Sequence, residues 1–413
     1  MAKKITHIIW KLFLASVLLT GAGCTSAQQS VQHNAHSSGS DKTIEDIETG
    51  ILGISKYGNI VLTVTPQTMM NYGYEEADII HVEIGDEQMT MPIGTNYSDV
   101  DAGSAICRYD MENTPQYVIL AISSGNLASA MNVADKHETN DDQGYEWIWR
   151  EGMGEDVSVK ITMAEKQGYA NEYEIHKVTA TRTNSRDDYP ELSDAQYANF
   201  RAVTTAGMGK DTLYRSSSPI NPKIGRNKEA DEALSLNGIR TVINLADYEK
   251  EMKEYPDYAS TWYSECSVLP LAMSMDMAAE ENRKKLAEGL RYILTQEGPY
   301  LIHCLEGKDR TGFVIAILEC LMGADIDAVI KDYMVTYDNF YHVKDNTDPY
   351  EPISAIIVNQ LHDAFHLDED TEFKKNESLQ AYAEQYILEL GLSSEELEAL
   401  KTKLSADYGG QQE

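Results

Sequence analysis

Basic residues and cysteines are scarce in this chain of 413 residues. Lysine and arginine together number 34 against 67 acidic residues, which gives a formal net charge of −33. Most of the surface should therefore repel nucleic acid, so we predict no nucleic-acid partner. The five cysteines, at positions 24, 107, 266, 304 and 320, are widely spaced and show neither a disulfide framework nor zinc-ligand spacing. We accordingly predict no metal site and no cofactor.

A long apolar run is missing from the N-terminus. Three lysines among the first eleven residues precede a short apolar core that ends in "LLTGAGC". This core is shorter than the roughly 20 apolar residues that a membrane span requires. The pattern resembles a bacterial lipoprotein signal, so we predict a signal peptide over residues 1–23 and lipidation of Cys24. The exported chain would then be tethered to the outer face of the bacterial membrane. The alternative is plain secretion after cleavage near Ala27.

A polar linker and a β-rich region are expected next. Residues 24–42 are rich in serine and glutamine and lack apolar periodicity, as linkers do. Residues 43–185 hold short runs rich in valine, isoleucine and threonine between glycine, asparagine and aspartate clusters. We predict a mostly-β domain of unknown role, a barrel or a sandwich, with strands at "GNIVLTVT", "ADIIHVEI", "QYVILAI", "DVSVKITM" and "YEIHKVTATR".

The pattern changes to alternating strands and helices over residues 190–405. A charged segment containing Pro190 marks the boundary. Short apolar runs at "TLYRSS", "GIRTVINLA" and "GPYLIHC" predict strands. Apolar spacing of three and four predicts helices at "ENRKKLAEGLRYILTQ", about Thr311 to Met322, "DIDAVIKDYMVTYDNFY", "PISAIIVNQLHDAF", "SLQAYAEQYILELG" and "SSEELEALKTKL". We predict an α/β domain in which helices flank a central sheet.

The segment "HCLEGKDRTG" has the composition of an anion-binding loop. Cys304 follows a strand, and a helix is expected to begin near Thr311. A loop in this position can turn its backbone N–H groups inward, and those donors favour the thiolate form of Cys304. Arg310 can bind two oxygens of a phosphate, and Gly307 permits a positive φ in the middle of the loop. A thiolate, a ring of donors and an arginine together indicate phosphoryl transfer through a cysteinyl-phosphate.

This loop resembles the signature of the protein tyrosine phosphatase superfamily, which is His-Cys, five residues, Arg, and Thr or Ser. Lys-Asp before the arginine resembles bacterial tyrosine and lipid phosphatases of dual or triple specificity, and "LYRSSSP", "GIRTVINLAD" and "DYMVTYDNF" follow the same family order. The resemblance implies a phosphatase fold with Cys304 as nucleophile. It also implies that phosphate is bound by Leu305, Glu306, Gly307, Lys308, Arg310 and Thr311.

The general acid is less clear from the sequence because the chain has no Trp-Pro-Asp tripeptide. The Lys-Asp-Arg subgroup implies Asp309, which we rank first. Asp276 and Asp247 are the second and third candidates. A protective disulfide between Cys266 and Cys304 is a further possibility for an exported thiol.

We therefore predict a protein-tyrosine or dual-specificity phosphatase that acts on a phosphorylated protein. An exported inositol-polyphosphate phosphatase of the phytase type, or a phosphoinositide phosphatase, is the alternative within the same chemistry. A surface binding protein whose phosphatase fold is vestigial is the alternative of another class.

Overall fold

The computed structural model of this protein describes residues 44–139, 144–368 and 371–408. The predicted signal peptide, Cys24 and the linker lie outside these residues. Within the described part of the chain, no helix combines the length and the apolar character needed to cross a membrane.

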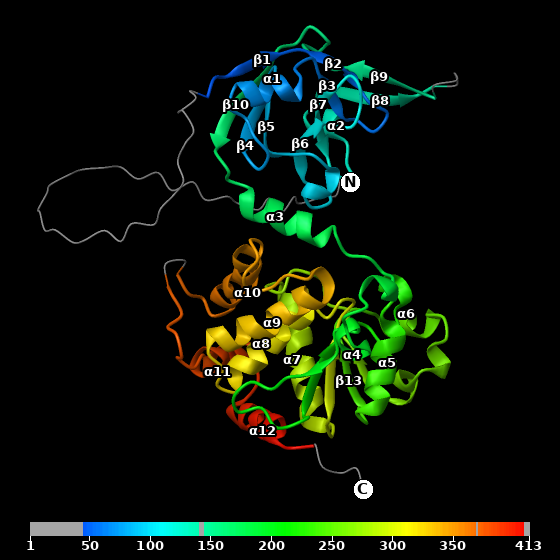
Figure 1. Ribbon diagram of the computed structural model, residues 1–413, viewed down its shortest axis with the longest axis vertical. Helices are drawn as coiled ribbons and strands as arrows, with labels where there is room; N and C mark the ends of the chain where they lie inside the picture. Colours follow the sequence, from blue (N-terminus) through cyan, green and yellow to red (C-terminus); the bar gives the residue numbers. More distant parts are fainter. Residues whose placement is uncertain (1–43, 140–143, 369–370, 409–413) are drawn as a thin grey trace, which may run out of the picture. The chain divides into compact units, whose positions relative to one another are not determined.

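The N-terminal described region is mostly β, as predicted (Figure 1). One sheet has the strand order β1-β10-β4-β5-β6-β7-β3-β2, and all neighbours are antiparallel except β5 and β6. Its edge strands β1 and β2 are joined by Gly50 alone, so the sheet curves back on itself. The strands are β1 (Ile47–Thr49), β2 (Ile51–Ile54), β3 (Ile60–Leu62), β4 (Ile79–Ile84), β5 (Glu87–Gly94), β6 (Ala105–Asp110), β7 (Tyr117–Ile122) and β10 (Val159–Glu165).

Alternation along these strands builds the core of the region. In β4, Ile80, Val82 and Ile84 are buried, whereas His81 and Glu83 are exposed, because successive side chains point to opposite faces of a sheet. Shorter elements complete the region: α1 (Pro66–Asn71), η1 (Tyr97–Asp99), α2 (Leu127–Ala130) and the separate hairpin of β8 (Ala134–Glu138) and β9 (Tyr145–Trp149).

The strand predicted at "YEIHKVTATR" is wrong, because this segment lies largely in the helix α3 (Ala170–Thr179). Its β-branched residues favour a strand only as a weak preference, which tertiary contacts override. Tyr173 is buried and its hydroxyl donates to Glu76 of the β-rich region. Ile175 and Val178 pack instead against the core of the α/β region. A helix can turn these side chains toward two different surroundings within six residues.

The α/β region is built on a five-stranded sheet of order β11-β12-β15-β13-β14. The last four strands in this order are parallel, and β11 is antiparallel. Every residue of β12, β13 and β15 is buried, as expected for parallel strands covered on both faces. The strands are β11 (Arg201–Ala202), β12 (Leu213–Ser216), β13 (Thr241–Asn244), β14 (Ser267–Pro270) and β15 (Tyr300–His303).

Helices cover both faces of this sheet. Tyr300 and Ile302 of β15 face the larger core, which contains α7, α8 and α9, whereas Leu301 faces the core beneath α5. The helices are α4 (Asp194–Tyr197), α5 (Asn227–Leu236), α6 (Glu249–Glu254), α7 (Glu280–Thr295), α8 (Asp309–Leu321), α9 (Ile326–Tyr341), α10 (Tyr350–Ala364), α11 (Gln380–Glu389) and α12 (Ser394–Ser405), with short 3-10 turns η2 (Arg186–Asp188), η3 (Pro222–Ile224), η4 (Tyr258–Ser260) and η5 (Trp262–Glu265). The helices predicted from periodicity are therefore confirmed.

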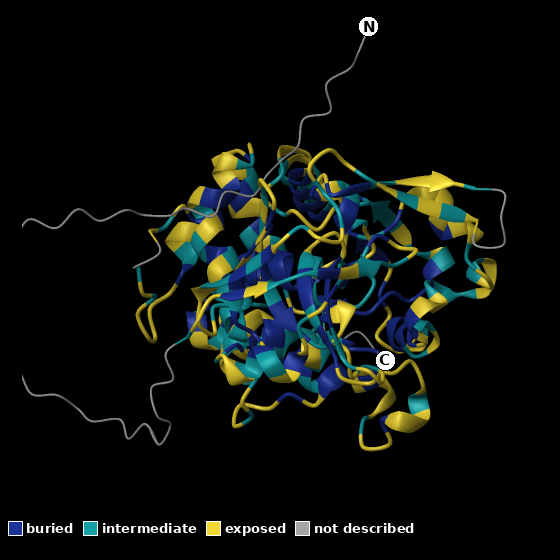
Figure 2. Cartoon of the chain, turned by 90° about the horizontal axis from the view of Figure 1, so that it is seen from above, coloured by how far each residue is buried: buried dark blue, intermediate teal, exposed yellow. Residues whose placement is uncertain are grey.

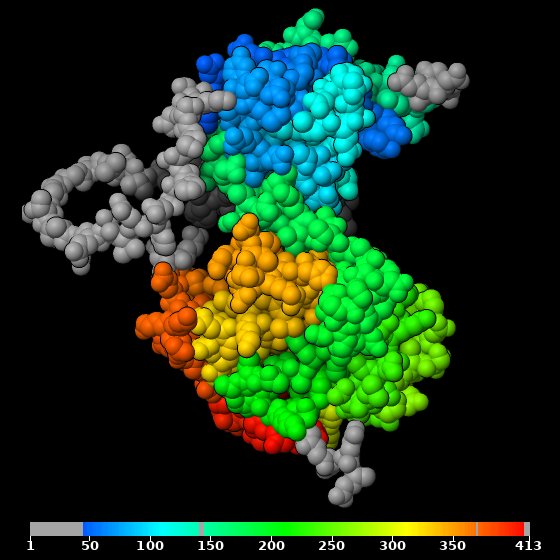
Figure 3. Space-filling model, in the orientation of Figure 1, coloured from blue at the N-terminus to red at the C-terminus, as the bar shows by residue number. Residues whose placement is uncertain are grey.

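Helix α8 is the central helix of this region. All its residues from Thr311 to Leu321 are buried, and buried positions appear dark blue in Figure 2. It packs against α9, α10 and α11, of which α10 is orange in Figure 3. The N-terminus of this enclosed helix follows the carboxyl end of the central strand β15 after a short loop.

Candidate active site

Cys304 directly follows β15 at the carboxyl edge of the sheet. The residue is 3% exposed, and α8 begins five residues later at Asp309. The neighbouring strands β12 and β13 run parallel to β15, so their carboxyl ends, Ser216 and Asn244, pair with His303 at the same edge. The segments that follow these three strands therefore surround the loop from Cys304 to Arg310.

Donors from the surrounding structure hold the carbonyl oxygens of this loop. The Cys304 carbonyl lies 3.1 Å from His303 Nδ1, and the Leu305 carbonyl accepts from the Ser218 N–H at 2.9 Å. The other two are bound by side chains: the Glu306 carbonyl by Asn199 Nδ2 at 3.1 Å and the Gly307 carbonyl by Arg215 Nη2 at 2.7 Å. In a trans peptide the N–H points opposite to the C=O. Fixing four successive carbonyls thus also fixes the directions of the next four N–H groups.

Within the described residues, no oxygen accepts a hydrogen bond from the N–H groups of Leu305 to Arg310. Asp309 and Arg310 add the unpaired N–H groups and positive dipole end of the first turn of α8. Such a cluster of donors is a binding site for a tetrahedral anion.

Gly307 is required by the course of the loop. Its φ is +69°, and a methyl group on its α-carbon would lie 2.2 Å from the Ser216 carbonyl oxygen. Both the left-handed backbone and the close approach of β12 exclude a side chain. The predicted role of this glycine thus agrees with the geometry of the loop.

Two side chains at the start of α8 keep unused polar atoms. Arg310 Nη1 donates to the carbonyls of Leu245 at 3.3 Å and Met273 at 3.0 Å. These two bonds fix the guanidinium, while its buried Nε has no partner among the described residues. The hydroxyl of Thr311 is also buried and unpartnered within the same part of the chain. Both groups could therefore bind a ligand that enters the loop.

A directed hydrogen-bond chain supports the loop from beneath. Burial lowers the pKa of His303 to about 4, so its ring is neutral at pH 7. Nδ1 faces the Cys304 carbonyl, which only accepts, and Nε2 must therefore accept from the Tyr263 hydroxyl at 3.0 Å. That hydroxyl accepts in turn from Asn244 Nδ2 at 3.1 Å. His303 thus acts as an orienting group with one defined tautomer.

A buried ionic cluster lies behind the loop. Asp332 of α9 bonds both Arg201 and Arg215, and the latter also binds the Gly307 carbonyl. Burial alone would raise the pKa of Asp332, but the two arginines outweigh it and lower the value to about 2. Burial instead raises the pKa of Glu319 in α8 well above its ordinary range. The cluster therefore holds two arginines and two acidic side chains, whose pKa values are shifted in opposite directions.

The mouth of the loop carries a second group of charges. Lys308 Nζ lies 3.4 Å from Glu306 Oε2 and 3.8 Å from Asp309 Oδ2. The Tyr341 hydroxyl donates to Glu306 Oε2 at 3.4 Å, and Arg182 forms an ion pair with the other oxygen. This side of the site therefore holds two cations and two carboxylates.

The three candidate acids occupy different surroundings. Asp309 lies in the loop itself, is 35% exposed and has Lys308 as its nearest cation. Asp276 is exposed on the segment after β14, and its carboxylate caps the Ala278 N–H at 3.1 Å. Asp247 is buried and accepts from Asn244 at 3.0 Å and from a tyrosine hydroxyl. Asp309 is therefore the candidate that lies in the loop itself, is partly exposed, and has a carboxylate that makes only the long contact with Lys308 within the described residues.

The possible disulfide between Cys266 and Cys304 is wrong, since both thiols are free. Cys266 precedes β14, whereas Cys304 follows β15. Thr241 of β13 pairs with Ser267 of β14 on one side and with Tyr300 of β15 on the other, so the first residues of the three strands lie level. Because these strands are parallel, the two cysteines lie at opposite edges of the sheet. Cys266 Sγ instead donates to the Ile239 carbonyl at 3.4 Å.

Sequence analysis missed several supporting residues. Asn199 binds the Glu306 carbonyl through Nδ2, and its Oδ1 accepts from Arg201 Nη1 at 2.7 Å. Tyr263 and Arg182 were missed as well. None of these residues belongs to a recognisable motif, although a positive φ of 52° at Asn199 marks a constrained position.

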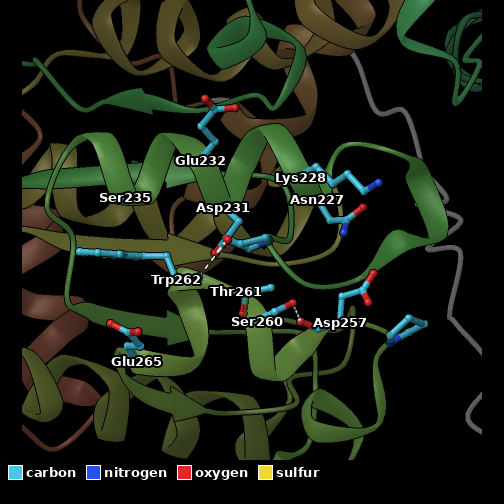
Figure 4. Close-up of a pocket in the computed structure, with 12 residues that line it drawn as sticks. Asn227, Lys228, Asp231, Glu232, Ser235, Asp257, Ser260, Thr261, Trp262 and Glu265 are labelled. Carbon is cyan, nitrogen blue, oxygen red and sulfur yellow. Dashed lines mark hydrogen bonds between the residues drawn. The ribbon is translucent and has the colours of Figure 1, made fainter.

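A cavity of about 580 Å³ lies elsewhere, between α5 and the segment around η4 and η5 (Figure 4). It contains no residue of the Cys304 loop, and four carboxylates line it against one ammonium group. Such a lining repels phosphate, so the loop is the better anion site. The charged lining residues are Lys228, Asp231, Glu232, Asp257 and Glu265. No cluster that could hold a metal ion occurs among the described residues.

Comparison with known proteins places these features in a family. The model of the tyrosine phosphatase family matches residues 160–406, more than half of the chain. The triple specificity protein phosphatase PtpB of Mycobacterium tuberculosis is 43% identical over 47 residues, which are 11% of this chain and 17% of that protein. The chain thus matches a small part of this curated relative.

Two solved structures are similar over the same share of the chain. The core catalytic domain of the PP-IP phosphatase SIW14 from S. cerevisiae is 19% identical, covering 41% of this chain and 88% of that one, with a TM-score of 0.27. TpbA from P. aeruginosa in complex with pTyr is also 19% identical, covering 41% of this chain and 94% of that one, with a TM-score of 0.26.

Proposed function

Because the chain belongs to the tyrosine phosphatase family, we propose that it hydrolyses phosphomonoesters, phosphotyrosine in proteins above all, through a cysteinyl-phosphate. The single observation that supports this proposal is the group of loop N–H donors next to Cys304 that have no acceptor among the described residues. A substrate group without several acceptor oxygens would leave buried donors unpaired, at a cost of about 1–3 kcal/mol each. A phosphoryl group satisfies them.

In the proposed first step, Cys304 Sγ attacks phosphorus and a P–S bond forms as the ester P–O bond breaks. The leaving oxygen takes a proton from Asp309. In the second step, Asp309 takes a proton from a water molecule whose oxygen attacks phosphorus, the P–S bond breaks, inorganic phosphate leaves and the Cys304 thiolate is regenerated. Arg310 and the loop N–H groups stabilise the equatorial oxygens in both steps, and Thr311 assists departure of the thiolate.

The electrostatics of the mouth favour a protein substrate over inositol polyphosphates. Lys308 is 12% exposed and already faces Glu306 and Asp309, so a substrate with many phosphates would meet carboxylates as well as cations. The relative named a triple specificity protein phosphatase supports activity on more than one kind of phosphoester. The presence of both Cys304 and Arg310 argues against a vestigial site.

Purified full-length protein should release phosphate from a phosphotyrosine peptide, with phytate and a phosphoinositide as competing substrates. Cys304→Ser should abolish turnover but keep phosphate binding, because only the nucleophile changes. Turnover that persists in this variant would rule out the cysteinyl-phosphate. Preferential hydrolysis of phytate would move the assignment to the inositol-polyphosphate alternative.

We also propose that the protein is exported and anchored through a lipidated Cys24. The support is the lysine-rich start and the small residues before this cysteine. Partitioning of the mature protein into a detergent phase, lost in Cys24→Ala, is the expected result. A mature N-terminus beyond residue 24 would contradict the anchor.

A further inference from the structure

Glu306 places a carboxylate next to the proposed phosphoryl site. Like charges repel, so an uncompensated carboxylate in a loop of seven residues opposes binding of a phosphate dianion. The Glu306 side chain is only 19% exposed, so water screens it incompletely. Its charge must be balanced by protein groups if the loop is to hold phosphate.

Two cations and one hydroxyl face this carboxylate. Arg182 Nη1 donates to Glu306 Oε1. Lys308 Nζ and the Tyr341 hydroxyl each lie 3.4 Å from Oε2. Arg182 therefore holds one oxygen by itself, while the lysine and tyrosine share the other.

Arg182 belongs neither to the loop nor to the sheet beneath it. It lies just after α3 and is separated from Glu306 by 124 positions in the sequence. Among the described residues, Glu306 is its only hydrogen-bond or ion-pair partner. The position of this arginine is thus explained by its contact with the catalytic loop.

We propose that Arg182 is a positioning residue that favours binding of substrate phosphate. It acts through Glu306, whose negative charge it neutralises and whose side chain it holds in place. The inference rests on the proposed function, because it concerns the same phosphate site. Without Arg182, Glu306 competes with phosphate for Lys308 and adds a negative charge near the loop. Phosphate binding should then weaken about tenfold, which corresponds to about 1.4 kcal/mol.

The test is a double-mutant cycle on the full-length protein, with binding of inorganic phosphate measured by calorimetry. Arg182→Gln should raise the Kd about tenfold, and Glu306→Gln should leave binding as tight as in wild type or tighter. In the double variant the arginine substitution should have no further effect, because the charge that it neutralised is gone. Arg182→Lys, which keeps the charge, should recover part of the loss.

Lys177→Gln is the matched control, since it removes one positive charge on α3 from a side chain that is 51% exposed and pairs with Glu174. This control should bind phosphate like wild type. An unchanged Kd in Arg182→Gln would overturn the inference. An equal loss in both backgrounds would also overturn it, because Arg182 would then contact phosphate itself.

The two proposals fail separately in this design. Phosphate binding can be measured without turnover. If the Kd values of the four proteins follow the expected cycle but no ester is hydrolysed, the proposed enzyme activity is refuted and the role of Arg182 is kept. Hydrolysis that depends on Cys304, together with wild-type phosphate binding in Arg182→Gln, would refute the role of Arg182 alone. A thermal unfolding midpoint measured for each variant identifies any loss that is due to misfolding.

Discussion

Replacing Gly307 with alanine tests whether the backbone of the loop is held in one shape by its neighbours. A methyl group there would lie 2.2 Å from the Ser216 carbonyl oxygen and 3.0 Å from the Ser217 nitrogen. Both contacts are with backbone atoms, so no side-chain rotation relieves them. Gly238 offers a matched control: its φ is +64°, against +69° at Gly307, and nothing lies within 4 Å of an added methyl group.

Both variants place alanine in a left-handed backbone, but only Gly307→Ala also creates a steric clash. A left-handed backbone costs an L-residue about 1–2 kcal/mol. Alanine also lowers the conformational entropy of the unfolded chain, which stabilises the folded state by about 0.4–1 kcal/mol. Gly238→Ala should therefore lower the free energy of unfolding by about 1 kcal/mol. Gly307→Ala adds a forced backbone shift, which for overpacking costs about 1–3 kcal/mol more. Its total loss should be about 2–4 kcal/mol.

The shift should also disable the site. It moves the Gly307 carbonyl away from Arg215 and turns the Lys308 N–H out of the anion site. A displacement of about 1 Å at a reacting centre can cost about 10²-fold in rate. We expect kcat/KM for a phosphotyrosine peptide to fall by that factor in Gly307→Ala and to stay near wild type in Gly238→Ala, with urea unfolding of both measured in parallel. Similar kcat/KM values for the two variants would refute the claim that the contact with β12 fixes the loop.

Two further predictions concern carboxylates. Asp309→Asn should slow phosphotyrosine turnover by about 10²-fold but slow an aryl phosphate with an acidic leaving group much less; equal losses on both substrates would make Asp309 structural and return attention to Asp276. For Asp332, the paired arginines outweigh burial and lower the folded-state pKa to about 2, against about 4 in the unfolded chain. The stability that this group contributes is therefore present above pH 4 and lost as the pH falls toward 2, by about 2 kcal/mol. The difference in urea-unfolding free energy between wild type and Asp332→Asn should shrink by this amount over that range, and a constant difference would contradict the assignment.

The elements around the site were predictable where local signals agree. A buried apolar run before Cys304 and helical periodicity after Arg310 place the strand, loop and helix, because both patterns arise within about fifteen residues. The supporting contacts were not predictable in this way. Arg182, Asn199 and Tyr263 meet the loop segment from 124, 107 and 40 positions away, and no local pattern encodes such pairings.

The segment after β10 shows how local preference fails. Ile175, Val178 and Thr179 are β-branched and favour a strand. The segment is instead helical: Tyr173 is buried and donates to Glu76, whereas Val178 is partly buried against the core of the α/β region. Arg215 and Asp332 show an intermediate case, since both lie in motifs shared with the family while their ion pair appears only in the folded chain.

The two outer strands of the α/β sheet limit how a strand of another chain can pair with this sheet. β11 contributes only two residues and runs against the rest of the sheet, and β14 ends in Pro270, which has no N–H to offer. Short edges and proline leave little free hydrogen-bonding ladder for a foreign strand to extend. Although every residue of the central strands β12, β13 and β15 is buried, the protein should thus resist edge-to-edge aggregation while it folds.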